Sequence, residues 1–109
     1  MTEGDTVGIL SDVEPELIPE LPQFFDNYQD DIDQLKQSLE DRDGDSIKST
    51  AHRIKGSSGS WGFQNIHKAA VKLEEASKNS DWDGMKTHLN TLEQRIADAR
   101  SAVKDELED

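Results

Sequence analysis

Apolar residues at helical spacing dominate the first half of the chain. Large apolar side chains recur there at steps of three and four residues, which places them on one face of an α-helix. These residues are Leu17, Leu21, Phe24, Tyr28, Ile32, Leu35 and Leu39. Pro15, Pro19 and Pro22 stand at the start of the pattern, where a missing backbone N–H is tolerated. We therefore expect a short lead-in helix followed by a long helix over about 21–41.

Three further segments show the same spacing, and each predicts a helix with one buried face. The first, over about 46–60, would bury Ile47, Ala51, Ile54 and Ser58, with Trp61 at its end. The second, which ends near 79–80, would bury Phe63, Ile66, Ala70, Leu73 and Ala76. The third, after a turn at 80–83, would bury Met85, Leu89, Leu92, Ile96, Ala99 and Val103.

Four amphipathic helices with short connections fit an antiparallel four-helix bundle. No segment alternates apolar and polar residues as a half-buried strand would, so the predicted fold class is all-α. Asp45, at the end of the first turn, is the expected N-cap of the second long helix. The 109 residues suffice for one domain, with its core over about 17–106 and residues 1–16 as a lead-in segment.

Charge is distributed unevenly along the chain. The formal net charge is −12, but residues 42–80 carry seven bases and four acids. The overall acidity argues against binding a bare nucleic-acid backbone or an anionic membrane surface. The chain has no cysteine for a disulfide or a thiolate metal site, and no apolar run approaches the roughly 20 residues of a membrane span. Since its start lacks a signal-peptide pattern, we expect a cytoplasmic protein without membrane insertion. We also expect it to be a monomer.

Residues 50–63 differ from an ordinary core helix. Two glycines inside a helix cost roughly 1 kcal/mol each relative to alanine, so their presence needs a reason. At about 100° per residue, Lys48, Lys55, Gly56 and Gly59 all fall within about 60° of His52, whereas the apolar residues fall elsewhere. We therefore expect His52 to point away from the core.

A simpler interpretation is that the Gly-Ser-Ser-Gly-Ser stretch over 56–60 is a flexible linker, as its composition alone would indicate. The phase of the glycines argues against it, because a linker has no reason to place them on the face of a histidine. A linker would also not continue directly into Trp61, Phe63 and another amphipathic helix.

The residues on this face suit group transfer. An exposed imidazole is substantially neutral at pH 7, and its free nitrogen is a competent nucleophile toward an activated phosphoryl group. Lys55, one turn along from His52, would bind the phosphoryl oxygens. Gly56 and Gly59 lack side chains and would leave open space beside the ring for the phosphoryl group and for a partner's active site.

The run His-x-Ile-Lys-Gly-Ser-Ser-Gly-Ser-Trp-Gly from His52 to Gly62 strongly resembles the motif of histidine-containing phosphotransfer (HPt) domains of two-component phosphorelays. Helix order, chain length and the position of the histidine on the second long helix resemble the whole domain, over about 12–106. The resemblance implies that His52 accepts and donates the phosphoryl group through Nε2. It also matches Lys55 and Gly56 to the family's lysine and glycine positions.

Other positions of the motif follow the same resemblance. Gly62 matches a second glycine of the family, and Ser57 and Ser58 match its small residues. Trp61 is bulkier than the apolar residue that the family often has there.

The resemblance also implies the partners. The receiver domain of a response regulator or hybrid sensor kinase would supply Mg²⁺ and the phospho-accepting aspartate, and this chain would hold no cofactor and have no catalytic machinery of its own. It would take the phosphoryl group from one receiver and pass it to another. The partner surface would include Lys48, Gly56 and Gly59. Together with Arg53 and Lys55, Lys48 would make a small basic surface that suits an acidic partner site.

Two rival functions remain open. One is an HPt-like helical adaptor that binds a partner without phosphotransfer. The other is a self-contained enzyme with His52 as general base, for which no second catalytic group is tied to the site by its spacing. Metal binding is disfavoured, because His52, His67 and His88 lack the i, i+4 pair of a helical metal site.

Overall fold

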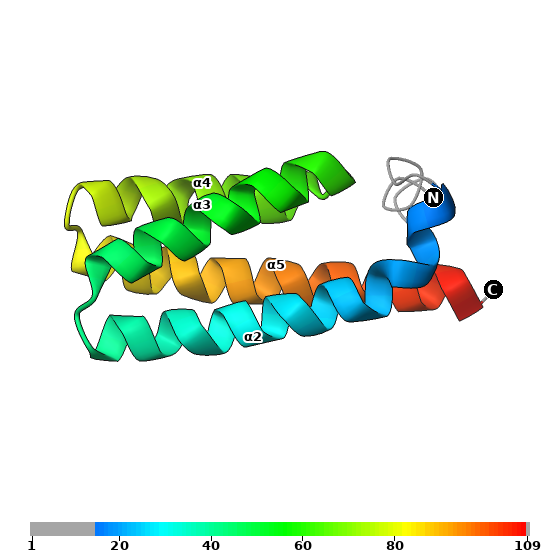
Figure 1. Cartoon of the computed structure of the whole chain (residues 1–109), viewed down its shortest axis with the longest axis horizontal. Coiled ribbons are helices and arrows are strands. Elements are labelled where there is room, and N and C mark those ends of the chain that lie inside the picture. The colour runs from blue at the N-terminus through cyan, green and yellow to red at the C-terminus, as the bar shows by residue number, and fades with distance from the viewer. Residues whose placement is uncertain (1–14, 109) are drawn as a thin grey trace.

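The computed structural model describes residues 15–108, which form a short 3₁₀ helix and four α-helices (Figure 1). In chain order these are η1 (Pro15–Glu20), α2 (Leu21–Glu40), α3 (Gly44–Trp61), α4 (Gln64–Lys78) and α5 (Trp82–Glu108). No strand occurs in this range, and the prediction of an all-α four-helix bundle is confirmed. The short helix that the prolines predicted is η1, and the rest of the lead-in segment, residues 1–14, lies outside the described residues.

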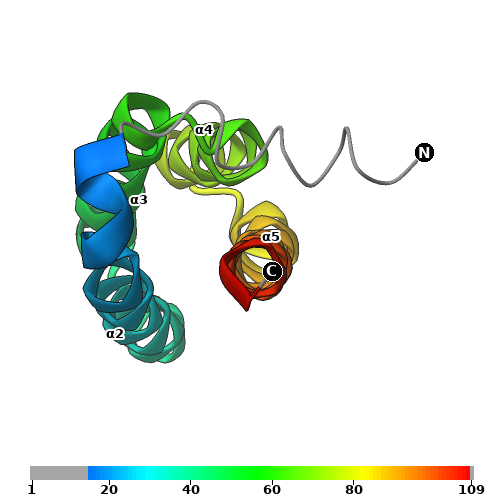
Figure 2. The ribbon, with the colours of Figure 1, turned by 90° about the vertical axis from the view of Figure 1, so that its right-hand side faces the viewer.

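Successive helices run in opposite directions around one core. Helix α3 packs against α4, α4 against α5, and α2 against both α3 and α5, as the view along the bundle in Figure 2 shows. The α2–α3 and α4–α5 connections lie at one end of the bundle, and the α3–α4 connection lies at the other (Figure 1). This topology places the middle of α3 beside the middle of α4, which matters for the site below.

The core contains most of the apolar residues that the helical spacing selected, while Leu17, Leu39 and Trp61 are partly buried against it. Phe25 and Ala69 are additions. Phe25 is 2% exposed although it lies off the predicted stripe of α2. Its ring meets Phe24 edge-on at a centroid distance of 5.2 Å and lies 5.7 Å from Phe63. Because α2 contacts two neighbouring helices, its buried face is wider than a single stripe.

The start of α3 differs from the prediction. Asp43, rather than Asp45, is the N-cap, and its side-chain oxygen accepts a hydrogen bond from the Ser46 N–H at 3.2 Å. The helix therefore begins at Gly44, and Asp45 lies in the first turn, where its negative charge complements the helix dipole.

Helix α3 is continuous through 56–60, so the linker interpretation is wrong. Ser58 is fully buried, and its hydroxyl donates to the Ile54 carbonyl at 2.6 Å. The Ser57 hydroxyl lies 2.6 Å from the Tyr28 hydroxyl on α2. Burial of Tyr28 raises its pKa to about 12. Ser57 therefore contacts α2, and Ser58 lies in the interior of the bundle.

The glycine that ends α3 has a conformational role. Gly62 has a φ of 86°, in the left-handed region that glycine adopts without strain. Its N–H donates to the Gly59 carbonyl at 3.3 Å, and the next N–H, of Phe63, donates to the Ser58 carbonyl at 2.9 Å. These two bonds form a Schellman motif, which turns the chain directly into α4.

Candidate functional site

His52 projects from the middle of α3, away from the core, as the phase of the helix predicted. Its side chain is 68% exposed, whereas Ala51 and Ile54 on the same helix are fully buried. His52 therefore lies on an open surface that a second protein can reach.

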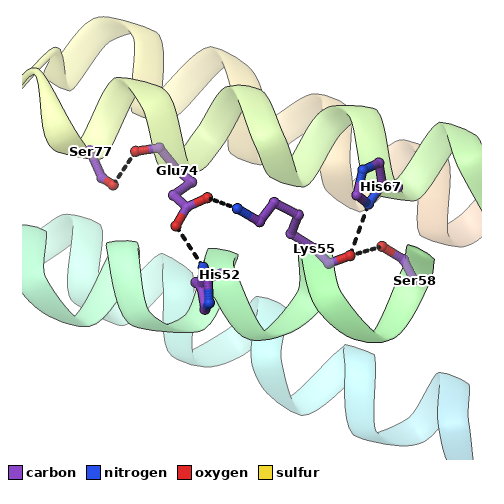
Figure 3. A network of polar contacts seen from close by, with 6 residues as sticks. All are labelled: His52, Lys55, Ser58, His67, Glu74 and Ser77. Carbon is purple, nitrogen blue, oxygen red and sulfur yellow. Dashed lines mark hydrogen bonds and ion pairs between the residues drawn. The ribbon is translucent and has the colours of Figure 1, made fainter. Parts of the chain in front are cut away.

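A carboxylate from the neighbouring helix holds the ring. Glu74 of α4 points toward α3, and its Oε2 lies 2.8 Å from Nδ1 of His52 (Figure 3). Its Oε1 accepts a hydrogen bond from Nζ of Lys55 at 2.6 Å. The Glu74 side chain is only 8% exposed, so this ion pair is shielded from water on most sides. One buried carboxylate thus joins the two residues that the sequence placed at the site.

The charge of Glu74 determines the tautomer of the neutral His52 ring. The Lys55 ammonium lowers the pKa of Glu74 most, burial opposes this, and the bond to His52 and the charge of Lys78 add to the lowering. Glu74 is therefore ionised at neutral pH and acts only as an acceptor. The hydrogen of the neutral ring must then reside on Nδ1, which leaves the lone pair on Nε2.

Sequence reasoning did not identify Glu74. It lies 22 residues beyond His52 on another helix, so no spacing within one helix links the two residues. The only sequence signal is that Glu74 lies next to Leu73, in the buried stripe of α4 and not on its solvent side. A charged residue at such a boundary position needs a partner, and α3 supplies two.

The two glycines differ in what surrounds them. A Cβ atom at Gly56 would have nothing within 4 Å, so the open space expected there is present. Because side chains of a helix lean toward its N-terminus, a side chain at 56 would lean over His52, one turn before it. At Gly59, a Cβ atom would lie 3.2 Å from Nδ1 of His67, so the space there is largely taken.

His67 explains the second glycine. Its Nδ1 lies 2.9 Å from the Lys55 carbonyl oxygen, and it donates to that oxygen because a carbonyl can only accept (Figure 3). The ring can come this close to α3 because Gly59 has no side chain. Gly59 thus leaves room for the His67 ring against α3.

The basic surface is smaller than the sequence indicated. Lys55 forms an ion pair with Glu74, and Arg53 forms one with Asp31 of α2. Lys48, also on α3, is exposed and forms no ion pair among the residues described.

No group of three or more histidine, aspartate or glutamate side chains within residues 15–108 is arranged to hold a metal ion. His67 and His88 lie on α4 and α5, respectively.

None of the helices within residues 15–108 combines the length and the apolar character that crossing a membrane would need.

Comparison with protein families decides what kind of domain this is. The family model of the Hpt domain matches residues 21–106, which include all of α2, α3 and α4. The chain belongs to the Hpt domain family. Neither a comparison with curated proteins nor one with solved structures gave a match.

Hpt domains carry a phosphoryl group on a histidine in two-component phosphorelays. They are phosphotransfer carriers, and they interact with receiver domains. Family membership therefore gives this chain the general role of a phosphorelay intermediate, as the sequence motif predicted.

The different surroundings of the two glycines predict unequal effects of alanine on stability. Gly56→Ala should raise the free energy of unfolding by about 0.5 to 1 kcal/mol, because alanine is the better helix former and its methyl group meets only open space. Gly59→Ala should give little of that gain, because its methyl group would lie against the His67 ring. Urea denaturation measures both, and in a His67→Ala background Gly59→Ala should recover the gain. Equal gains in the native background would contradict the proposed contact with His67.

The lowered pKa of Glu74 predicts a pH-dependent contribution to stability. Its stabilisation is present above the ordinary pKa of 4.5 and is lost as the pH falls through the lower value of the folded state. At pH 7, Glu74→Gln should cost about 1 to 2 kcal/mol of unfolding free energy, and the gap to the native protein should close as the pH falls below 4.5. The exposed neighbour provides the control, since Glu75→Gln should show no such gap. A gap for Glu74→Gln that is constant from pH 7 to pH 3 would show that its charge does not contribute.

Proposed function

We propose that the chain accepts a phosphoryl group on Nε2 of His52 from the aspartyl phosphate of one receiver domain and passes it to the aspartate of another. The observation that carries this proposal is the contact between Nδ1 of His52 and the Glu74 carboxylate, at 2.8 Å. That contact leaves the second ring nitrogen as the nucleophile on an exposed surface.

The transfer balances without a proton donor in this chain. The lone pair of Nε2 attacks the phosphorus of the aspartyl phosphate, the N–P bond forms, and the P–O bond breaks as the aspartate leaves as a carboxylate. The ring gains positive charge while Nδ1 keeps its hydrogen, and the Glu74 carboxylate stabilises that charge. In the second transfer, a carboxylate oxygen of the next receiver attacks the phosphorus, and the electron pair of the N–P bond returns to Nε2.

Lys55 is placed to act on the phosphoryl group itself. Its ammonium has three N–H donors, of which one is used at 2.6 Å by Glu74. The remaining donors lie one helical turn from His52 and are available for phosphoryl oxygens. Gly56 keeps the space over the ring free for the three oxygens and for the approach of the receiver.

The receiver supplies the rest of the reaction centre. In this proposal it brings the Mg²⁺ ion and the aspartate, and the in-line arrangement of nucleophile, phosphorus and leaving oxygen forms only in the complex. The 68% exposure of His52 favours this division over a self-contained enzyme, whose general base would lie in a cavity that excludes water. An adaptor without phosphotransfer is also disfavoured, because partner binding alone gives no reason to fix the hydrogen of the imidazole on Nδ1.

A labelling experiment tests the proposed function. The protein is incubated with receiver domains of the same organism that have been phosphorylated on their aspartate with acetyl phosphate. The native chain should gain a label that is lost in acid and stable in alkali, as expected for an N–P bond, and His52→Gln should gain none.

His67→Gln is the matched control, since His67 is a second histidine whose Nδ1 is hydrogen-bonded, in this case to the Lys55 carbonyl. It should label as the native chain does. Equal labelling of His52→Gln and the native chain would rule out His52 as the acceptor. Absence of label from every receiver would favour the adaptor.

A further inference from the structure

Lys48 of α3 and Lys78 of α4 lie at the same level of the bundle. His52 of α3 contacts Glu74 of α4, and the two helices run antiparallel. Lys48 is four residues before His52 on α3, and Lys78 is four residues after Glu74 on α4. One helical turn in each direction therefore carries both lysines to the same end of the site.

Both lysines lie on the surface without a direct carboxylate partner among the described residues, in contrast to Lys55 and Arg53. The charge of Lys78 is felt at Glu74, where it is one of the causes that lower the pKa of that carboxyl group. Lys78, which the sequence analysis does not select, therefore adds a second exposed positive charge to that of Lys48 near the His52–Glu74 contact.

The surroundings make this pair distinct. The net charge of the chain is −12, and α2, on the other side of α3, carries five acids and one base. Its Asp31 neutralises Arg53, so the α2 side of His52 contributes no free positive charge from that residue. An acidic partner would be repelled by most of this molecule and attracted at the Lys48–Lys78 pair.

We propose that Lys48 and Lys78 form the electrostatic docking site for the acidic phosphorylation pocket of the receiver domain. This inference rests on the proposed function, which gives the receiver as partner, and it adds which residues draw that pocket to His52. The pocket must hold an aspartate and a phosphoryl group, so its charge is complementary to the pair. Lys55 remains with Glu74 and acts after docking, on the phosphoryl oxygens.

The test is the rate of phosphotransfer as a function of salt. The probe is the receiver domain, phosphorylated on its aspartate, that labels the native chain fastest. At low ionic strength, Lys48→Gln and Lys78→Gln should each lower the second-order rate constant about three- to fivefold. At about 0.5 M salt, where exposed charges are screened, the variants and the native chain should converge. The transfer rate at saturating receiver should stay unchanged, because docking and not chemistry is affected.

Lys72→Gln is the matched control. Lys72 is an exposed lysine of α4, the helix that carries Lys78. It lies about 160° around this helix from Glu74 and thus points away from His52. It removes the same unit of charge and should leave the rate nearly unchanged. Equal effects of all three substitutions, or no effect of Lys48→Gln and Lys78→Gln, would overturn the docking site while the native chain still transfers phosphate. Failure of the native chain to label on His52 would instead overturn the proposed function.

Discussion

The Glu74 carboxylate is the constraint on which the site depends. It bonds to Nδ1 of His52 at 2.8 Å and to Nζ of Lys55 at 2.6 Å, and it does so from a largely buried position. An ionised carboxylate is costly to bury unless each oxygen is paired, and here each oxygen has its own partner. The same pairing fixes the hydrogen of the imidazole and holds the lysine one turn from it. A largely buried carboxylate therefore determines which nitrogen of an exposed ring carries the hydrogen.

The small residues of α3 leave room for side chains of the bundle that pack against this helix. Ser58 is fully buried, and Gly59 leaves space for His67, which donates to the backbone of α3 at the Lys55 carbonyl. Gly56 contributes to none of this packing, since a Cβ atom there would contact nothing. In the proposed function this space gives access to the ring, so two glycines of one motif, three residues apart, have different surroundings.

The sequence predicted well whatever depends on a single helix. Helical spacing selected the buried faces, and the phase of α3 correctly placed His52 on the outside. It failed where two helices meet. The sequence around Glu74 does not reveal that α3 lies opposite, and the sequence around Arg53 does not reveal its ion pair with Asp31 of α2. Positions on one helix follow from 3.6 residues per turn, whereas contacts between helices follow from their register, which the turns at 41–43 and 62–63 set.

The most direct test of this account is the tautomer of His52, measured from the ¹⁵N chemical shifts of its ring by NMR at a pH where the ring is neutral. We predict hydrogen on Nδ1 and a free Nε2 in the native protein, and a mixture of tautomers in Glu74→Gln, whose amide can both donate and accept. We also predict that phosphotransfer slows in that variant, while Glu75→Gln keeps both the native tautomer and the native rate. A native protein with the hydrogen on Nε2 would contradict the central role given to Glu74.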